Sequence, residues 1–549
     1  MMDEQGRDRH KVWTPLLFSI VLVTGMVFGF NLRDTLRNKR NIATVIERND
    51  RLEEIIDLIN AKYVDTVKSN LLYKDAVAGI LNPLDPHTVY IPAEELQGVN
   101  DDLEGGFSGI GVEFSIIRDT IRVTSVIENG PAGRAGVEIG DQLVKVGDSL
   151  VAGTAITSSR IVHLLKGKQH SSVLVTLKQI ANGLPRQVTI TRDVVPIYSV
   201  DASLMLDSVT GFIKVNRFSA TTYEEFRNAL KKLINVGARQ LILDLRDNPG
   251  GYLDAATSIC DDFLDDKKLI VYTKGIHTLK AEFRASGDKG LFEQGRLIVL
   301  VDESSASASE IVAGAIQDWD RGVIVGRRTF GKGLVQEQYN LPDGAALRLT
   351  TAKYYTPSGR CIQRSFAKGR DAYMQDYERR FENGELTGRD TLKVTDTTRY
   401  FTFKNRIVYG GGGIKPDVFV PYDTTKISVP LISLVYSQEL KAATWDYFIR
   451  NKSRLNYKNI VEYNEMFNME DQVVNNYLGM LKPADLVAAH KVLANQASYQ
   501  VFKLQVKAQI ARFMFRDNGY YAIMLRDDEV VHKALGIFSS GHYSKILGK

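Results

Sequence analysis

A serine and a lysine near the middle of the chain have the types and spacing of a nucleophilic catalytic pair. Ser307 lies in a Ser/Ala-rich turn where an amphipathic helix is predicted to begin, and Lys332 follows 25 positions later between two glycines. A serine hydroxyl needs a base to attack a peptide carbonyl, and a helix start offers N–H groups and a positive dipole end to the developing oxyanion. Lysine can be that base only when neutral, a form that burial beside Phe330, Leu334 and Val335 would favour.

Two other motifs in this region indicate different chemistry. The segment 326–332 matches the phosphate-binding pattern G-x-x-x-x-G-K, but Gly333 stands where a serine or threonine would bind magnesium, and a strand is predicted where a helix should begin. The segment 365–368 matches the S-x-x-K of penicillin-interacting enzymes. It lacks the S-D-N and K-T-G motifs that accompany it in those enzymes, so a chance match is the better interpretation.

The same serine and lysine also have structural interpretations. Ser307 and Glu310 have the spacing of a capping box, in which the serine stabilises the helix by about 1 kcal/mol. A lysine between two glycines is usually a solvated turn residue. Taken singly, each structural interpretation is favoured, and only the pair favours catalysis. No His–Asp pair is conveniently placed for a triad, although a distant one stays possible.

The elements around this pair alternate between strand and helix. A strand at 211–218, a helix at 221–237, a buried strand at 240–245 and the central stretch at 297–336 predict a sheet with crossover helices. The turn NPGG follows the buried strand and could bring the N–H of Gly250 or Gly251 to the same oxyanion.

A smaller β-rich module precedes this α/β region. About five short strands and one helix lie between residue 105 and residue 194. Its loop FSGIGVEF is either a tight turn or a backbone nest. In the second interpretation Gly109 and Gly111 free the N–H groups around Ile110 to bind a carboxylate, while the next strand pairs with an extended peptide. Residue types alone support the two interpretations about equally.

Size and composition set the wider limits. The 549 residues suggest three or four domains, and 44% apolar and 25% charged residues are typical of a globular protein. A net charge of +5 without a basic block gives little support to nucleic-acid binding. Cys260 and Cys361 form neither a disulfide framework nor a zinc site, and core packing is the better expectation for both.

The N-terminal region predicts a membrane anchor. Residues 12–32 carry no charge over 21 positions, enough to span a bilayer as a helix of about 20 residues. No small-residue cleavage site follows, so an uncleaved anchor is favoured, while basic residues on both sides leave its orientation undecided by charge. His87, in the proline-flanked turn LDPHTVYIP, is expected to be structural rather than catalytic.

These patterns predict five regions. The regions are a tail and anchor at 1–34, a helical region at 35–98, the β-rich module at 99–194, the α/β domain at 195–427 and a helical C-terminal domain at 428–549. A charged stretch without periodicity at about 366–410 is expected to be an insertion or long loop. The C-terminal domain is expected to be a helical partner or cover without chemistry of its own.

Two longer motif sets resemble known families. The loop GIGVEF and the stretch GPAGRAGVEIGDQLVKVGD resemble a PDZ domain, with the first as its carboxylate-binding loop. The order LRDNPGG, SASASEIVAGAIQD, VIVGRRTFGKGLVQ and DGAALRLTTAKYYTPSGRCIQ is similar to the carboxyl-terminal processing, or tail-specific, proteases. Together with LDPHTVYIP the resemblance covers residues 42–425.

The second resemblance implies a crotonase-like α/β catalytic core and a set of site residues. It places the nucleophile on Ser307, the general base on Lys332 and a glutamine that hydrogen-bonds this lysine on Gln336. The oxyanion would be bound by the N–H of Ala308 and by that of Gly250 or Gly251, and the peptide carboxylate by residues 109–111. The sequence departs from the family pattern at Asp302-Glu303-Ser304, which could alter the pH dependence, and at Lys166, where many relatives have arginine.

The resulting expectation is a serine endopeptidase that recognises protein C-termini. It would need no metal or cofactor, act on substrates with free C-termini, bind no nucleic acid, and could form a homo-oligomer. Its anchor would lie in the cell inner membrane with the catalytic body on the periplasmic side. A non-catalytic peptide-binding scaffold is the main alternative, which the intact Ser–Lys–Gln set disfavours. A crotonase-type enzyme acting on thioesters is another, which the PDZ-like module disfavours.

Overall fold

The computed structural model describes residues 51–127, 129–179, 183–388, 398–424, 428–468 and 471–548. The chain divides into two units, residues 1–80 and 81–549. The first contains the helix α2 (Arg51–Lys62) and most of α3 (Ser69–Leu81), neither of which has a fully buried residue. The predicted anchor at 12–32 lies outside the described residues, and no helix among those described is long and apolar enough to cross a membrane.

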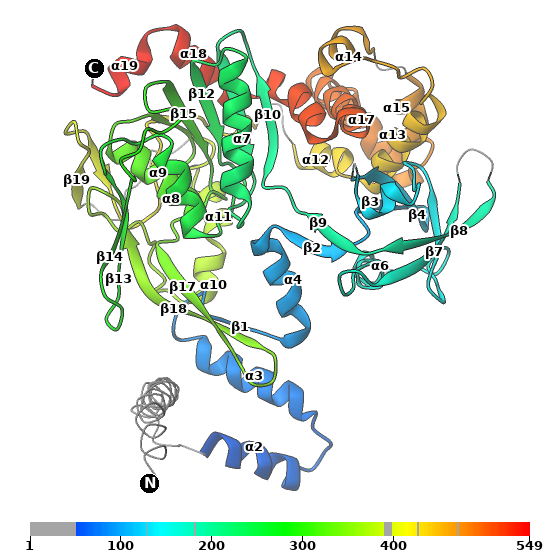
Figure 1. Cartoon of the computed structure of the whole chain (residues 1–549), viewed down its shortest axis with the longest axis horizontal. Coiled ribbons are helices and arrows are strands. Elements are labelled where there is room, and N and C mark those ends of the chain that lie inside the picture. Colours follow the sequence, from blue (N-terminus) through cyan, green and yellow to red (C-terminus); the bar gives the residue numbers. More distant parts are fainter. Residues whose placement is uncertain are drawn as a thin grey trace, which may run out of the picture. The chain divides into compact units, whose positions relative to one another are not determined.

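The second unit is built around a six-stranded sheet (Figure 1). Its strands, in spatial order, are β10 (Val200–Met205), β11 (Thr210–Val215), β12 (Gln240–Asp244), β15 (Arg296–Val301), β16 (Val323–Gly326) and β21 (Val418–Phe419). Strands β11 to β21 run parallel, and β10 is antiparallel to β11. The four inner strands are buried along almost their whole length, as expected for a parallel sheet covered on both faces.

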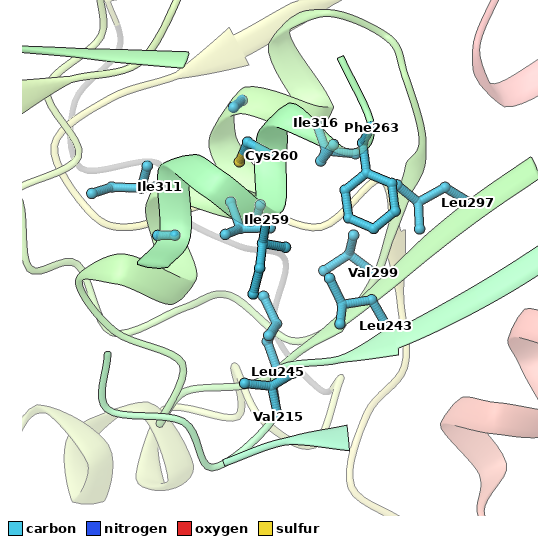
Figure 2. Packing of buried hydrophobic residues seen from close by; sticks show 14 of the residues in the cluster. Val215, Leu243, Leu245, Ile259, Cys260, Phe263, Leu297, Val299, Ile311 and Ile316 are labelled. Atoms are coloured by element: carbon cyan, nitrogen blue, oxygen red, sulfur yellow. The ribbon is translucent and has the colours of Figure 1, made fainter. Parts of the chain in front are cut away.

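Helices cover both faces of this sheet. One face packs against α7 (Thr222–Asn235), α8 (Leu253–Asp261) and α9 (Ala308–Asp318), and Figure 2 shows Leu243, Val299 and Cys260 in that cluster. The other face packs against α18 (Glu529–Ser539) and α19 (His542–Ile546). The end of the chain therefore completes the core of the α/β domain. Cys260 is fully buried there, as predicted, whereas Cys361 is only partly buried.

A second, antiparallel sheet stands beside the first. It contains β1 (Val89–Ile91), β18 (Ala346–Tyr355), β13 (Leu269–Lys274) and β14 (Ala281–Arg284), with β17 (Leu334–Asn340) also paired to β18. Strand β17 begins two residues after Lys332, so this sheet positions the candidate base.

The β-rich module is a separate sheet with its own core. Its strands are β3 (Val112–Ile117), β4 (Thr120–Val126), β5 (Gln142–Val146), β6 (Ser149–Leu150), β7 (Ser172–Lys178) and β8 (Pro185–Thr191). The helices α5 (Pro131–Arg134) and α6 (Ser158–Leu165) pack on it. Strand β3 is at the edge of the sheet, and β2 (Gly106–Gly109) pairs with β9 (Asp193–Pro196) where the module joins the chain; the helix α4 (Ala93–Glu104) precedes β2.

Two further regions complete the second unit. A helical group has its own aromatic-rich core. Its helices are α12 (Val429–Val435), α13 (Gln438–Arg450), α14 (Ile460–Met466), α15 (Asp471–Leu478), α16 (Pro483–Leu493) and α17 (Gln496–Met524). The charged stretch is ordered into α10 (Arg370–Met374), α11 (Asp376–Glu382) and the hairpin β19 (Arg399–Phe401) and β20 (Ile407–Tyr409). Its described part is therefore not one long loop, and the other expectation, an insertion, stays a prediction.

Candidate active site

The residues predicted to do chemistry surround one cavity. It has a volume of about 580 Å³ and lies where the carboxyl ends of β12 and β15 meet the start of β17. Its lining includes the predicted residues Ser307, Ala308, Gly250, Gly251, Lys332 and Gln336. Residues that are far apart in sequence therefore share one concave site, a common arrangement for enzyme active sites.

Ser307 is the serine of the SASAS run that faces this cavity. The hydroxyl of Ser305 donates to the carbonyl of Leu245 at 2.8 Å, and that of Ser309 donates to the carbonyl of Asn248 at 3.0 Å. Both are fully buried, whereas Ser307 is partly exposed and lines the cavity. The three serines are thus distinguished by their surroundings, which sequence alone could not show.

The backbone of Ser307 is strained. Its φ of 54° and ψ of −112° lie outside the regions that residues with a Cβ normally adopt, and α9 begins at the next residue. This strand–turn–helix geometry costs about 1–3 kcal/mol and presents the side chain above the end of the sheet. Strain of this kind at the head of a helix is a recurring feature of nucleophilic serines.

Glu310 joins the serine to the lysine. Its buried carboxylate accepts hydrogen bonds from the N–H groups of Ser307 (2.9 Å), Gly331 (2.8 Å) and Lys332 (2.8 Å), and from the hydroxyl of Thr329 (2.5 Å). Burial raises the pKa of Glu310 to about 7, and the four donors act in the opposite direction. The sequence indicated only a helix cap here, because its other donors lie about 20 positions downstream.

Lys332 has the surroundings of a base. Its Nζ donates to Oε1 of Gln336 at 2.9 Å, and the pKa of Lys332 is lowered by burial and by the charge of Arg348. Gln336 is oriented in turn, since its Nε2 donates to the backbone carbonyl of His87. The amide oxygen of Gln336 orients the amine without placing a negative charge beside it. No hydrogen bond joins Nζ to the hydroxyl of Ser307 among the described contacts.

The turn that contains His87 holds the carbonyl that orients Gln336. Asp85 accepts from the N–H of His87 at 2.8 Å and from that of Thr88 at 2.9 Å, which fixes the turn. Nε2 of His87 lies 2.8 Å from the hydroxyl of Tyr373. Burial and the charge of Lys332 lower the pKa of His87 to about 4, so its imidazole is neutral at pH 7. The expectation of a structural histidine stays a prediction.

Three backbone N–H groups in the residues that line the cavity differ in whether they have an acceptor. That of Gly250 donates to Oδ1 of Asn248 at 2.9 Å. Those of Gly251 and Ala308 have no acceptor within the described part of the chain. A Cβ on Gly250 would lie 2.7 Å from that of Ser307, and one on Gly251 would lie 2.0 Å from the carbonyl oxygen of Phe218. Only glycine fits either position, and the two free donors are those of Gly251 and Ala308.

The loop of the β-rich module also has free donors. The carbonyl of Ile110 accepts from Ala132 at 2.8 Å, and that of Gly111 accepts from Ile127 at 3.0 Å. The N–H groups of Ile110 and Gly111 have no acceptor among the residues that the structure describes. Gly111 has a φ of 76°, which favours glycine, and Gly109 ends β2 opposite Asp193. Two successive free N–H groups beside the edge strand β3 support the nest interpretation of this loop.

Two sequence expectations near the site have structural outcomes. The phosphate-binding alternative at 326–332 was wrong, because strand β17 follows Lys332 where a helix is required. Both acids beside the serine have structural partners. Glu303 pairs with Arg327 at 2.7 Å, and Asp302 accepts from the N–H of Ser305 at 3.0 Å. Burial raises the pKa of Asp302 to about 6.

Comparisons with known proteins show which families the chain resembles. The family model for peptidase family S41 matches residues 209–369, a PDZ-domain model matches 122–179 and a model for a family of unknown function matches 431–517. The chain is 35% identical over 318 residues to a carboxy-terminal-processing protease of Bartonella bacilliformis, covering 57% of this chain and 72% of that protein. It is 31% identical over 358 residues to a probable CtpA-like serine protease of Staphylococcus aureus, covering 64% of this chain and 69% of that protein. Among solved structures, the photosystem II D1 C-terminal processing protease is 28% identical with a TM-score of 0.32, covering 57% of this chain and 90% of that one.

An α/β core with a serine at a strained helix start, joined to a PDZ domain, defines a serine-type peptidase. The chain belongs to peptidase family S41, among the carboxyl-terminal processing proteases.

Proposed function

We propose that Ser307 is the nucleophile of this peptidase and that Lys332 is its general base, oriented by Gln336. The observation that carries the proposal is the shared cavity, which brings the one available serine of the SASAS run to a lysine with a lowered pKa. The only side-chain partner of Nζ among the described residues is the neutral amide of Gln336. Catalytic hydrogen bonds often tighten only when substrate binds, so the missing Nζ–Oγ bond is compatible with this role.

The proposed chemistry is acyl transfer through an ester intermediate. Neutral Lys332 takes the proton of the Ser307 hydroxyl as Oγ adds to the scissile carbonyl, and the oxyanion receives hydrogen bonds from the N–H groups of Ala308 and Gly251. As the C–N bond breaks, the protonated Nζ returns its proton to the leaving amine. The lysine, neutral again, takes a proton from the water that attacks the ester carbonyl. As the bond between the acyl carbon and Oγ breaks, Nζ gives this proton to Oγ, which restores the serine hydroxyl and releases the new carboxyl end.

We also propose that the PDZ domain selects substrates by their tails. An extended C-terminal segment would pair with the free edge of β3, and its carboxylate would accept hydrogen bonds from the loop at 109–111. The free N–H groups of Ile110 and Gly111 support this assignment. A membrane anchor at residues 12–32 with the body on the periplasmic side, and a homo-oligomeric state, belong to the same proposal and rest on the sequence.

The first experiment measures cleavage of an unfolded reporter with a free apolar C-terminus. The soluble body, residues 35–549, is compared with its Ser307→Ala variant and with the matched variants Ser305→Ala and Ser309→Ala. We expect Ser307→Ala to abolish cleavage with a nearly unchanged melting temperature. The two controls should keep activity but lose about 1 kcal/mol of stability each, because they remove buried hydrogen bonds. Cleavage by Ser307→Ala would reject the assignment of the nucleophile.

A second experiment tests tail recognition with one reporter in two forms. Amidation of the reporter's C-terminus removes the carboxylate charge and leaves the cleaved segment unchanged. We expect processing to weaken several-fold, mainly through KM, because the loop N–H groups lose a charged acceptor. Equal processing of the two forms would show that the PDZ domain does not read the terminal carboxylate.

A further inference from the structure

A second cavity, of about 270 Å³, lies between the charged stretch that the sequence left without a role and the segments at 328, 364–365 and 411–412. Five cationic side chains and two carboxylates line it. The cationic residues are Arg328, Arg364, Lys368, Arg379 and Arg380, and the acidic residues are Asp376 and Glu385. Five positive and two negative charges leave an excess of three positive charges in a small concave space.

Each carboxylate in this cavity is shared by two arginines. Asp376 pairs with Arg364 at 2.5 Å and also with Arg379. An acid that neutralises two guanidinium groups leaves each of them with unmatched charge. Lys368, in the Ser365-Phe-Ala-Lys368 segment that the peptidase does not use, has no acidic partner within the described ranges.

The other carboxylate repeats the pattern. Glu385 pairs with Arg328 at 2.8 Å and with Arg380 at 2.9 Å. Arg380 is almost fully buried, and its pKa is lowered to about 10 by burial and by the neighbouring charge of Arg328. Like charges held this close in a buried place destabilise one another unless an anion offsets them.

One of these arginines also has an unused donor. Arg364 is stacked between Phe330 and Tyr373, with its guanidinium carbon 4.0 and 3.9 Å from the two ring centres. Its side chain is only 9% exposed, and its Nε has no hydrogen-bond partner among the described residues. A buried arginine with an unused N–H donor is a second indication that the charged groups of this cavity bind a further partner.

We propose that this cavity is a binding site for a small, multiply charged oxyanion of the phosphate type. Guanidinium groups match the geometry of such oxyanions, and Lys368 adds a mobile charge at the exposed side of the cavity. The occupant would offset the positive excess that Asp376 and Glu385 leave.

The site is adjacent to the loop that carries the candidate base. Arg380 donates to the carbonyls of Arg328 and Thr329, and the N–H of Arg364 donates to the carbonyl of Gly331 at 3.0 Å. These bonds hold the backbone that leads into Lys332. An oxyanion that draws the arginines together would therefore stiffen this loop.

Isothermal titration of the full chain with inorganic phosphate, at ionic strength held constant with sodium chloride, tests the proposal. The protein carries Ser307→Ala, so that the result does not depend on the proposed catalytic roles. We expect saturable binding at one site, and a tenfold or greater loss of affinity in the double variant Lys368→Gln/Arg379→Gln. Both side chains are exposed, so the fold should tolerate the change.

The matched control is Lys280→Gln/Arg284→Gln, which removes the same two charges from an exposed hairpin. It should bind phosphate as the parent does. Sulfate, a second tetrahedral oxyanion, should compete with phosphate for the site. Absence of saturation, or equal affinity in the Lys368/Arg379 variant and the parent, would overturn the proposal.

Discussion

Ser307 and Lys332 face the same cavity from two segments that are positioned in different ways. The serine is held by its own neighbourhood: β15 leads into the turn, α9 follows at once, and the flanking Ser305 and Ser309 are bonded to the adjacent chain at 245–248. The lysine depends on residues far away in sequence. Its partner Gln336 is oriented by the carbonyl of His87, 249 positions upstream.

Two buried groups connect these segments. Glu310 accepts from the N–H groups on both sides, and the single hydroxyl proton of Tyr354 lies between two acceptors, the carbonyls of Ser307 (3.0 Å) and Lys332 (2.5 Å). The serine is thus set by local strain and the lysine by long-range contacts, with shared polar groups fixing one against the other. A nucleophile needs a fixed attack geometry, whereas the base needs a fixed environment to remain neutral.

Removal of the base should have the largest effect. Lys332→Ala should lower kcat/KM by about 10²–10⁴-fold, the usual contribution of a positioned general base. Stability should change little, because the variant also removes the cost of burying a charged amine. Reporter cleavage and thermal unfolding measure the two effects. The control is Lys353→Ala, an exposed lysine on β18 opposite Leu334, which should retain parental activity. Substantial activity in Lys332→Ala would assign the base elsewhere.

Disruption of the shared carboxylate should affect both segments. Glu310→Gln places an amide among four donors, so at least one of them loses its acceptor. The free energy of unfolding should fall by about 2 kcal/mol, with a fall in kcat rather than a rise in KM. Urea unfolding and steady-state kinetics check this, with the exposed Glu337→Gln on β17 as the control. Parental stability and kcat would show that Glu310 does not couple the two sides.

The contrast between the two segments also explains what the sequence could predict. The serine side is local: a short apolar strand, a small-residue turn and an amphipathic helix predict a serine at a helix start, whereas the choice of Ser307 and Ala308 came from the family resemblance. The choice between Gly250 and Gly251 needed the bond from Gly250 to Asn248, which depends on the turn conformation. On the lysine side, Gln336 came from the family resemblance, and no pattern in the sequence indicated the contact with His87.

The helices of the charged stretch were not predicted, for a related reason. Its helices α10 and α11 have only 5 and 7 residues, too short to show periodicity. They are ordered by ion pairs such as Arg364–Asp376 and Arg328–Glu385. Charge without periodicity suggested a loop because sequence does not show which charges meet. The helices at the C-terminal end were expected to be a partner or a cover, and the structure packs α18 on a face of the central sheet.

A charge placed beside the lysine should sharpen the contrast further. Gln336→Glu puts a carboxylate next to Nζ, which favours the charged amine and raises the pKa of Lys332. In the parent, kcat/KM should rise with pH to a plateau with a midpoint below 10.5, because the neutral fraction of Lys332 increases. The variant should have a higher midpoint, and its activity at neutral pH should fall about tenfold if the pKa of Lys332 rises by about 1. Gln336→Met, which adds no charge, should keep the low midpoint. Identical pH profiles for all three proteins would exclude Lys332 as the titrating base.

The smallest expected effect concerns the distant support of the lysine side. The pKa of His87 is about 4 in the folded protein, below the ordinary value of 6.5, because of burial and the charge of Lys332. The unfolded chain therefore binds more protons between these values, so the contribution of His87 to stability is complete above pH 6.5 and is lost as the pH falls toward 4. His87→Gln removes this titration while keeping a polar group toward Tyr373, and should reduce the loss of stability between about pH 7.5 and pH 5. Denaturant unfolding of both proteins at about pH 7.5 and pH 5 measures the loss in free energy of unfolding. A third measurement at about pH 8 is the reference at which His87 does not titrate. Equal losses in the free energy of unfolding for parent and variant would mean that the turn that contacts Gln336 does not bury a neutral histidine. The support of the lysine would then come from the backbone carbonyl of His87 alone.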